Sequence, residues 1–296
     1  MRIAHATDIH WYEPATTSEL LRSPKRLIGT ANLIFRRRKN HFSRTVQAAL
    51  VQHLTDLKPD LVCLTGDLTS TSLDSEFATA RAALDPVLST TPTFVIPGNH
   101  DRYTHGAHNS DRIRKHFDVW MGGTGPVTRL EIGSLTVLGL DPNQPTGLHA
   151  HGILPADQLI GLSHALNSPD LESRDVVLCV HYPLLDRQGA LYDGWDHGLR
   201  NAAAVIEVLR KARKRPLAIL SGHEHRGYRV DVDLGDVRVP LLNCGSSGYA
   251  YRPEVQRCAA MAVYDVTDGK LGAIERFHYD GNGFRPEEGG AFATGR

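Results

Sequence analysis

Residues 60–67 read DLVCLTGD, a short apolar run that ends directly in Gly66 and Asp67. A run of this length, bounded by turn-forming residues, is typical of a buried β-strand. Helical periodicity over 41–57, 74–88, 155–166 and 201–213 alternates with strand-like runs, which predicts an α/β fold. Four further runs resemble the first and end in Asp, Asn or His: RIAHATDIH (2–10), TFVIPGNHD (93–101), DVVLCVH (175–181) and PLAILSGHEH (216–225).

The pattern changes over residues 228–279, where four strand-like runs alternate with turn signals such as Asp268-Gly269. We expect these strands to form an antiparallel set that packs as a second sheet. The chain is expected to form one domain over residues 1–280. The Gly-rich, polar segment 281–296 is expected to be a loose C-terminal tail.

The composition is that of a globular protein, with 296 residues, 33 basic and 33 acidic side chains, and 41% apolar residues. It excludes a mainly disordered chain, and the neutral balance argues against a nucleic-acid polymer as partner. No apolar stretch is long enough to span a bilayer and no secretory signal is visible, so a cytoplasmic location is expected. The four cysteines form no CxxC pair and are expected to be buried free thiols. Nothing in the sequence indicates an oligomeric state.

Five groups of side chains that can bind metals each lie just beyond the end of a predicted strand. Because strand ends of one direction share an edge of a sheet, these side chains are expected to meet in one crevice. Carboxylate, imidazole and amide oxygen together suit Mn, Fe and Zn. The candidate ligands are Asp8, His10, Asp67, Asn99, His181, His223 and His225, and His100 and Asp101 follow Asn99 directly.

The number of ligands predicts two metal ions. Two Asp, one Asn and four His are too many for one catalytic ion that keeps an open position. One carboxylate can bridge two ions held about 3.5–4 Å apart, and such a pair activates water and neutralises phosphoryl oxygens. The sequence has no GxSxG motif and no Walker A loop. Direct attack on a phosphoryl group by metal-activated hydroxide is therefore the expected mechanism.

The motifs D-x-H (8–10), G-D (66–67), G-N-H-D (98–101), a lone His181 and G-H-x-H (222–225) occur in that order. This series resembles the calcineurin-like metallophosphoesterases, and the resemblance covers residues 3 to about 245, including Asn243-Cys244-Gly245-Ser246. It implies two stacked mixed β-sheets flanked by helices, a four-layer α/β/β/α sandwich. Glu224 departs from the pattern, because many relatives have a small or polar residue there.

The resemblance also implies a role for each residue. The first metal would be held by Asp8, His10 and His225. The second would be held by Asn99, His181 and His223, with Asp67 as the bridge. His100 would contact the phosphate and stabilise or protonate the leaving oxygen, and Asp101 would orient His100.

By size and by the GNHD block, the chain most resembles bacterial cyclic-nucleotide phosphodiesterases, so a phosphorylated small molecule of that kind is the leading substrate. One alternative is an amphiphilic phosphate, such as a phospholipid or a UDP-diacylglucosamine-like pyrophosphate. Another is a non-catalytic scaffold, which is disfavoured because no metal motif is broken.

A basic amphipathic insert at about 11–41 suggests the lipid alternative. Between Leu20 and Thr45 the chain has eight basic residues and no acidic one, and its apolar residues from Leu27 to Phe35 have helical spacing. Two interpretations stay open. The segment at 20–45 is either a surface helix with a solvated basic face, or a lid that contacts an acyl chain or a membrane surface, which would make the protein peripheral to the membrane. Candidate substrate-binding residues are Arg26 in the insert and three residues of predicted loops, Tyr103, His105 and Trp195.

Overall fold

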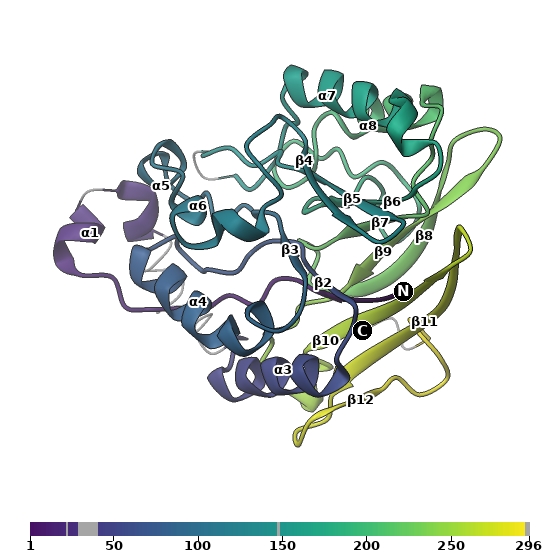
Figure 1. The fold of residues 1–296 in the computed structure, drawn as a ribbon. Coiled ribbons are helices and arrows are strands. Elements are labelled where there is room, and N and C mark those ends of the chain that lie inside the picture. The colour runs from purple at the N-terminus through teal and green to yellow at the C-terminus, as the bar shows by residue number, and fades with distance from the viewer. Residues whose placement is uncertain (22, 29–40, 147–148, 294–296) are drawn as a thin grey trace.

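Two six-stranded β-sheets pack face to face, and helices cover the outer face of each sheet (Figure 1). The computed structural model describes residues 1–21, 23–28, 41–146 and 149–293. The four-layer α/β/β/α sandwich expected from the resemblance is confirmed.

The first sheet combines strands from the two ends of the chain. Its members are β1 (Arg2–Ala6), β2 (Leu61–Leu64), β3 (Thr93–Val95), β10 (Ala260–Thr267), β11 (Lys270–Tyr279) and β12 (Phe284–Pro286). They lie in the order β12-β11-β10-β1-β2-β3. The central strand β1 is parallel to β2 and antiparallel to β10, so that Ile3 lies opposite Leu61 on one side and Tyr264 on the other.

The second sheet is built from the middle of the chain. Its members are β4 (Thr128–Ile132), β5 (Leu135–Leu140), β6 (Asp175–Val180), β7 (Ala218–Ser221), β8 (Gly227–Asp233) and β9 (Arg238–Cys244). They lie in the order β4-β5-β6-β7-β9-β8, with β5, β6, β7 and β9 parallel to one another.

Helices shield the outer faces of both sheets. The first sheet is covered by α3 (Arg44–Leu57) and α4 (Asp74–Leu88), and the second by α7 (Ala156–Asn167) and α8 (Ala202–Lys211). Three short helices, α1 (Thr17–Leu21), α5 (His105–Asn109) and α6 (Arg112–Phe117), lie beside α4 at the left of Figure 1.

The inner strands β2, β5, β6 and β7 are apolar on both faces because both faces are buried. On β2, Val62 and Leu64 face α3 and α4, whereas Leu61 and Cys63 belong to the apolar layer between the sheets. Successive side chains of a strand point to opposite faces of the sheet. Because both faces are buried here, neither face needs the polar residues that a solvent-exposed face would have. The strand ends on both sheets are thereby held rigidly.

The expected separate antiparallel sheet over residues 228–279 is wrong. The hairpin of β8 and β9 extends the second sheet beside β7, and β10 to β12 extend the first sheet beside β1. Without the later strands, β1 and β7 would each leave one edge of their sheet unpaired. The strand pattern alone does not tell which later strand pairs with which edge.

The first part of the segment 281–296 does not form the loose tail that was expected. Residues 284–286 form β12 and pair with β11, with Phe284 opposite Tyr279. Glu287 is buried and forms an ion pair of 2.9 Å with buried Arg276. A buried charge pair fixes this segment, which composition alone could not indicate.

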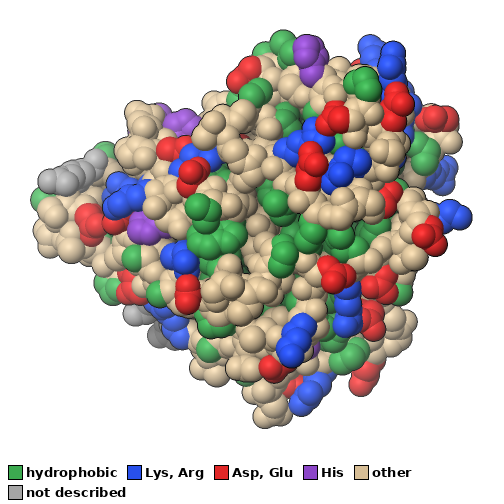
Figure 2. All heavy atoms as spheres, in the orientation of Figure 1, with side chains coloured by type: hydrophobic (Ala, Val, Ile, Leu, Met, Phe, Trp, Pro, Cys, Tyr) green, Lys and Arg blue, Asp and Glu red, His purple; other side chains and the backbone are tan. Residues whose placement is uncertain are grey.

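Only part of the insert at 11–41 lies within the described residues. Helix α1 and a helical turn at 24–28 are present, whereas the rest of the predicted amphipathic stripe, at 29–40, lies outside the described residues. Within the described ranges, no helix is long and apolar enough to cross a membrane. The face seen in Figure 2 mixes basic and acidic side chains, which agrees with the net charge of zero.

Candidate metal centre

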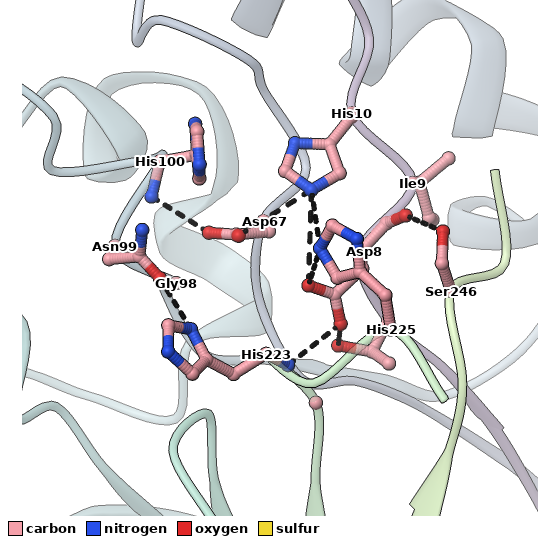
Figure 3. Close-up of polar contacts among 12 residues, drawn as sticks. Asp8, Ile9, His10, Asp67, Gly98, Asn99, His100, His223, His225 and Ser246 are labelled. Carbon is pink, nitrogen blue, oxygen red and sulfur yellow. Dashed lines mark hydrogen bonds and ion pairs between the residues drawn. The ribbon is translucent and has the colours of Figure 1, made fainter. Parts of the chain in front are cut away.

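The predicted metal-binding residues lie in the loops that follow β1, β2, β3, β6 and β7. The loops come from both sheets rather than from one sheet edge, and their side chains converge on a single centre (Figure 3). Backbone hydrogen bonds tie the loops together, as when the Asp8 N–H donates to the Gly66 carbonyl at 3.0 Å. The predicted convergence is therefore present.

Five of these residues have a left-handed backbone, with φ of 52° at Asp8, 56° at His10, 54° at Asp67, 72° at His223 and 57° at His225. This conformation costs about 1–3 kcal/mol for a non-glycine residue, and Asp and His tolerate it better than most. Because this conformation occurs at five residues of one centre, the surrounding fold must stabilise a backbone geometry that these residues do not favour, as is common at functional sites.

A first group of four ligand atoms comes from Asp8, His10, Asp67 and His225, and these atoms lie within 4.8 Å of one another. His225 Nε2 is 3.0 Å from Asp8 Oδ1 and 3.3 Å from His10 Nε2. Asp8 Oδ1 is buried and accepts no hydrogen bond from any residue the structure describes. An unsatisfied buried carboxylate oxygen beside two imidazole nitrogens fits a cation in this position.

A second group surrounds the side-chain oxygen of Asn99. His223 Nδ1 lies 2.9 Å from Asn99 Oδ1, and His181 Nε2 lies 3.2 Å from it. Asp67 belongs to both groups, because its Oδ2 is 3.4 Å from His181 Nε2 and 3.6 Å from His10 Nε2. Figure 3 shows Asp67 between the two groups, in the position of a bridge.

Hydrogen bonds away from the centre leave one nitrogen of each histidine pointing inward. His10 and His181 use Nδ1 to contact the carbonyls of Thr69 at 3.1 Å and Thr65 at 2.8 Å. A neutral histidine that donates one N–H to a carbonyl presents the other nitrogen as a lone pair, the form that binds metal.

The other two histidines are held in the same way through other atoms. His223 reverses the arrangement, with Nε2 donating to the His197 carbonyl at 2.9 Å and Nδ1 facing Asn99. His225 Nδ1 lies 2.7 Å from the Tyr249 hydroxyl, which leaves Nε2 facing Asp8.

The charges in the centre are strongly coupled. Burial lowers the pKa of His225, but the Asp8 carboxylate and the Tyr249 hydroxyl outweigh burial and raise that pKa to about 10. Burial likewise lowers the pKa of His181, and Asp67 outweighs it and raises the pKa to about 9. In the absence of metal, the raised pKa values favour protonated His181 and His225 beside the carboxylates. A divalent cation would take the place of those protons.

His100 lies beside the centre, but its ring contacts a backbone carbonyl and not the expected partner, Asp101. Its ring Nδ1 donates to the Ser70 carbonyl at 2.6 Å, and its backbone N–H donates to Asp67 Oδ1 at 2.8 Å. The buried Asp101 carboxylate instead accepts the N–H groups of Leu68 at 3.2 Å, Thr69 at 2.9 Å and Gly98 at 3.0 Å. Asp101 thus fastens the loops after β2 and β3 to each other, and it acts on His100 only through them.

The four substrate-binding candidates lie in different surroundings. Tyr103 stacks on His100 with ring centroids 5.4 Å apart and planes at 13°. Trp195 is 62% exposed and contacts His149, at a centroid distance of 4.3 Å. Arg26 is buried and contacts backbone carbonyls, and His105 is exposed at the start of α5 rather than in a loop. Only Tyr103 therefore contacts a residue of the centre.

Sequence reasoning missed several residues that position the ligands. Tyr249 holds His225, Ser70 holds His100, and Ser246 donates its hydroxyl to the Asp8 carbonyl at 2.7 Å. Only Ser246 had a signal in the sequence, as part of the Asn-x-Gly-Ser run. The carbonyl of Ser70 offers none, because any residue can supply a backbone acceptor.

Comparison with known proteins agrees with this geometry. The model of the calcineurin-like phosphoesterase family matches residues 1–227. A probable glycerophosphodiester phosphodiesterase GpdQ from Arcobacter nitrofigilis is 28% identical over 60% of this chain and 61% of its own. A cAMP/cGMP dual specificity phosphodiesterase from Mycobacterium tuberculosis is 27% identical over 71% and 65%. The chain thus spans somewhat less than two thirds of the length of these two relatives.

Solved structures resemble the fold at low sequence identity. A dimetal phosphatase from Danio rerio has a TM-score of 0.56 at 15% identity, over 96% of this chain and 98% of its own. Purple acid phosphatase PPD1 from yellow lupin has a TM-score of 0.58 at 13% identity, over 96% and 52%. With the family model matched over residues 1–227, the chain belongs to the calcineurin-like phosphoesterase family.

Proposed function

We propose that the protein is a dinuclear metal-dependent phosphoesterase that hydrolyses a phosphodiester. The observation that carries the proposal is the position of Asp67, whose Oδ2 lies within 3.6 Å of a ligand nitrogen in each of the two groups. In this proposal Asp8, His10 and His225 complete the first metal site. Asn99, His181 and His223 complete the second.

The donor set of carboxylate, imidazole and amide oxygen suits Mn, Fe or Zn. Bound divalent ions would lower the pKa of a water toward neutrality and would neutralise charge on phosphoryl oxygens. The protein supplies orientation. Ser70 holds the His100 ring by Nδ1, which leaves Nε2 to contact the phosphate or the leaving oxygen.

A protonated His100 could donate from Nε2 to the leaving oxygen, and its environment tunes that proton. Burial lowers the pKa of His100, whereas the Asp67 carboxylate and the Ser70 carbonyl raise it, and the net shift is downward. A lowered pKa makes the imidazolium a stronger acid but leaves a smaller fraction of His100 protonated near neutral pH.

For the substrate we propose a cyclic-nucleotide-type phosphodiester. The similar protein named for cAMP and cGMP supports this class, and the one named for glycerophosphodiesters supports a phosphodiester more generally. Amphiphilic phosphates remain the second candidate, because the insert exposes apolar side chains, with Leu21 77%, Leu27 49% and Ile28 46% exposed.

Metal content and a substrate panel test the proposal. The protein purified with added Mn should contain two metal ions per chain and should hydrolyse bis-p-nitrophenyl phosphate and cyclic AMP. Asp67→Asn should lose metal and activity. Asp56→Asn, which removes the same charge from the exposed surface of α3, should change neither. A chain without bound metal, or full activity in Asp67→Asn, would refute the proposal and would favour a non-catalytic scaffold.

A matched pair of surface changes separates the two substrate classes. The double variant Leu27→Ser with Ile28→Ser should leave hydrolysis of cyclic AMP intact, because both side chains are about half exposed. If the double variant loses activity on phospholipid in detergent micelles while keeping activity on cyclic AMP, the amphiphilic substrate is supported. Absence of activity on any lipid phosphate would remove that candidate.

A further inference from the structure

A cavity of about 480 Å³ lies between the insert and helices α5 and α6, outside the metal centre. Figure 1 shows these segments next to one another at the left. Three cationic side chains line the cavity, Lys25, Arg26 and Arg112, together with His105 and Thr104. Such a volume is sufficient for a small organic ligand.

Among the described residues, the three cations contact neutral groups. Lys25 Nζ donates to the Thr146 carbonyl at 2.6 Å, and Arg112 donates to the Ser72 carbonyl at 2.7 Å. Within the part of the chain that the structure describes, none of the three cations has a carboxylate oxygen within 4.0 Å. Their positive charges therefore have no direct partner among those residues.

Arg26 stands out among the buried arginines of the described ranges, which are Arg26, Arg102 and Arg276. Arg102 forms ion pairs with Asp141 at 2.7 Å and with Asp111 at 2.9 Å, and Arg276 forms its pair with Glu287. Buried charges are normally compensated in this way.

The contacts of Arg26 are weak by comparison. Arg26 is 5% exposed, and its nitrogens reach the carbonyls of Thr71 and Glu19 at 3.4 Å and the Thr104 hydroxyl at 3.5 Å. All of these distances are near the outer limit of a hydrogen bond. Its planar guanidinium is thus compensated by weak dipoles, and an anion in the cavity would improve its contacts.

The acidic side chains on the cavity wall have partners of their own. Asp74 contacts Lys115 Nζ at 2.8 Å and His116 Nε2 at 3.1 Å. Glu19 accepts the backbone N–H of Thr16 at 2.8 Å. Both act on the cavity only at longer range, so the compensation they provide to the three cations is weak.

Electrostatic shifts agree with an uncompensated positive charge. Burial lowers the pKa of Lys25 to about 8. Burial and the nearby Arg112 lower the pKa of Arg26, and the more distant Glu19 and Glu76 offset this only in part. A bound anion would reverse these shifts.

We propose that this cavity binds a phosphate group, as an anion site separate from the two proposed metal sites. Two arginines and a lysine match the geometry and charge of phosphate oxygens. The site adjoins the metal centre through one aromatic ring. Lys25 Nζ lies 4.7 Å from the centroid of the Tyr103 ring, which stacks on His100. The phosphate is either a second phosphate of the substrate or part of a free phosphorylated ligand.

Calorimetric titration with inorganic phosphate tests the site. The full chain should bind one phosphate when prepared without metals, and Lys25→Gln and Arg112→Gln should each weaken this binding about tenfold or more. Lys25→Arg should retain it. Arg114→Gln is the matched control, because Arg114 lies on the same helix as Arg112 but pairs with Asp118 at 2.6 Å, away from the cavity.

Absence of saturable phosphate binding in the wild-type chain would overturn the proposal. Equal weakening in Arg114→Gln and Arg112→Gln would also overturn it, because loss of any positive charge would then have the same effect. Variants that fail to fold are recognised by circular dichroism, and because Lys25→Gln and Arg112→Gln are separate substitutions, the test does not depend on either one alone.

A kinetic measurement, which rests on the proposed function, identifies the source of the phosphate. The dinucleotides pApA and ApA share one phosphodiester and differ by one terminal phosphate. A lower KM for pApA, with the advantage lost in Lys25→Gln and Arg112→Gln, assigns the site to the substrate. Equal KM values with retained phosphate binding assign it to a free ligand. Phosphate binding without hydrolysis of any substrate would refute the proposed function and leave this site standing.

Discussion

The ion pair between Arg276 and Glu287 gives a sharp test of how the C-terminal segment is held. Both side chains are buried, and Arg276 Nη1 is 2.9 Å from Glu287 Oε1. Arg276 Nε also donates to the Cys244 carbonyl at 3.0 Å, next to the loop whose Ser246 supports Asp8. Glu287→Ala would leave the guanidinium buried without its carboxylate.

Removal of one member of a buried ion pair costs about 3–5 kcal/mol. Unfolding entropy scales with chain length at about 2.1 cal/mol/K per residue, so 1 kcal/mol lowers the Tm of a chain of this size by about 1.6 °C. Glu287→Ala should therefore lower the Tm by about 5–8 °C. The double variant Arg276→Met with Glu287→Leu should regain much of that loss, since the uncompensated charge is then gone.

Thermal unfolding followed by circular dichroism measures this effect, with Glu288→Ala as the control. Glu288 is the neighbouring exposed residue and should change the Tm by less than about 1 °C. A Tm for Glu287→Ala within about 2 °C of the wild type would refute the reasoning. Residues 284–287 would then be as loose as the composition of the tail suggests.

Three further outcomes follow from the metal centre. Asp67→Ala should lose both metals, because the shared carboxylate belongs to both groups; two metals per chain in elemental analysis would contradict this. His100→Ala should retain both metals while kcat falls about a hundredfold, roughly 2.7 kcal/mol, and an unchanged kcat would contradict its role. Metal affinity should rise from pH 6 to pH 9, because the raised pKa values of His181, about 9, and His225, about 10, make protons compete with metal below those values; a flat profile in equilibrium dialysis would contradict this.

The sequence was sufficient to predict which candidate ligands come together, because each follows a strand directly. A strand end has a fixed direction, so the motif residues at 8–10, 66–67 and 98–101 had to lie close together once β1, β2 and β3 paired in parallel. The type and order of the side chains then indicated two metals. Local pattern and chemical type carry this information without any knowledge of distant contacts.

The parts that could not be predicted depend on contacts between distant residues. Nothing in the sequence of β10 indicates that it pairs with β1, far away in the chain, in addition to its neighbour β11. The partner of the His100 ring is the Ser70 backbone carbonyl, and the sequence could not indicate it because every residue has such a carbonyl. The pairing of Glu287 with Arg276 likewise joins β11 to a segment whose Gly-rich composition resembles a loose tail.

The central position of β1 in the first sheet has a consequence for biosynthesis. Its antiparallel partner β10 begins at Ala260, roughly 250 residues later, which at 5–20 residues per second corresponds to about 12–50 s of translation. Throughout that interval one edge of β1, the first strand to be synthesised, has no native partner on the nascent chain. Unpaired strand edges promote aggregation. A ribosome-associated chaperone that covers this edge would therefore protect the nascent chain most before β10 is synthesised.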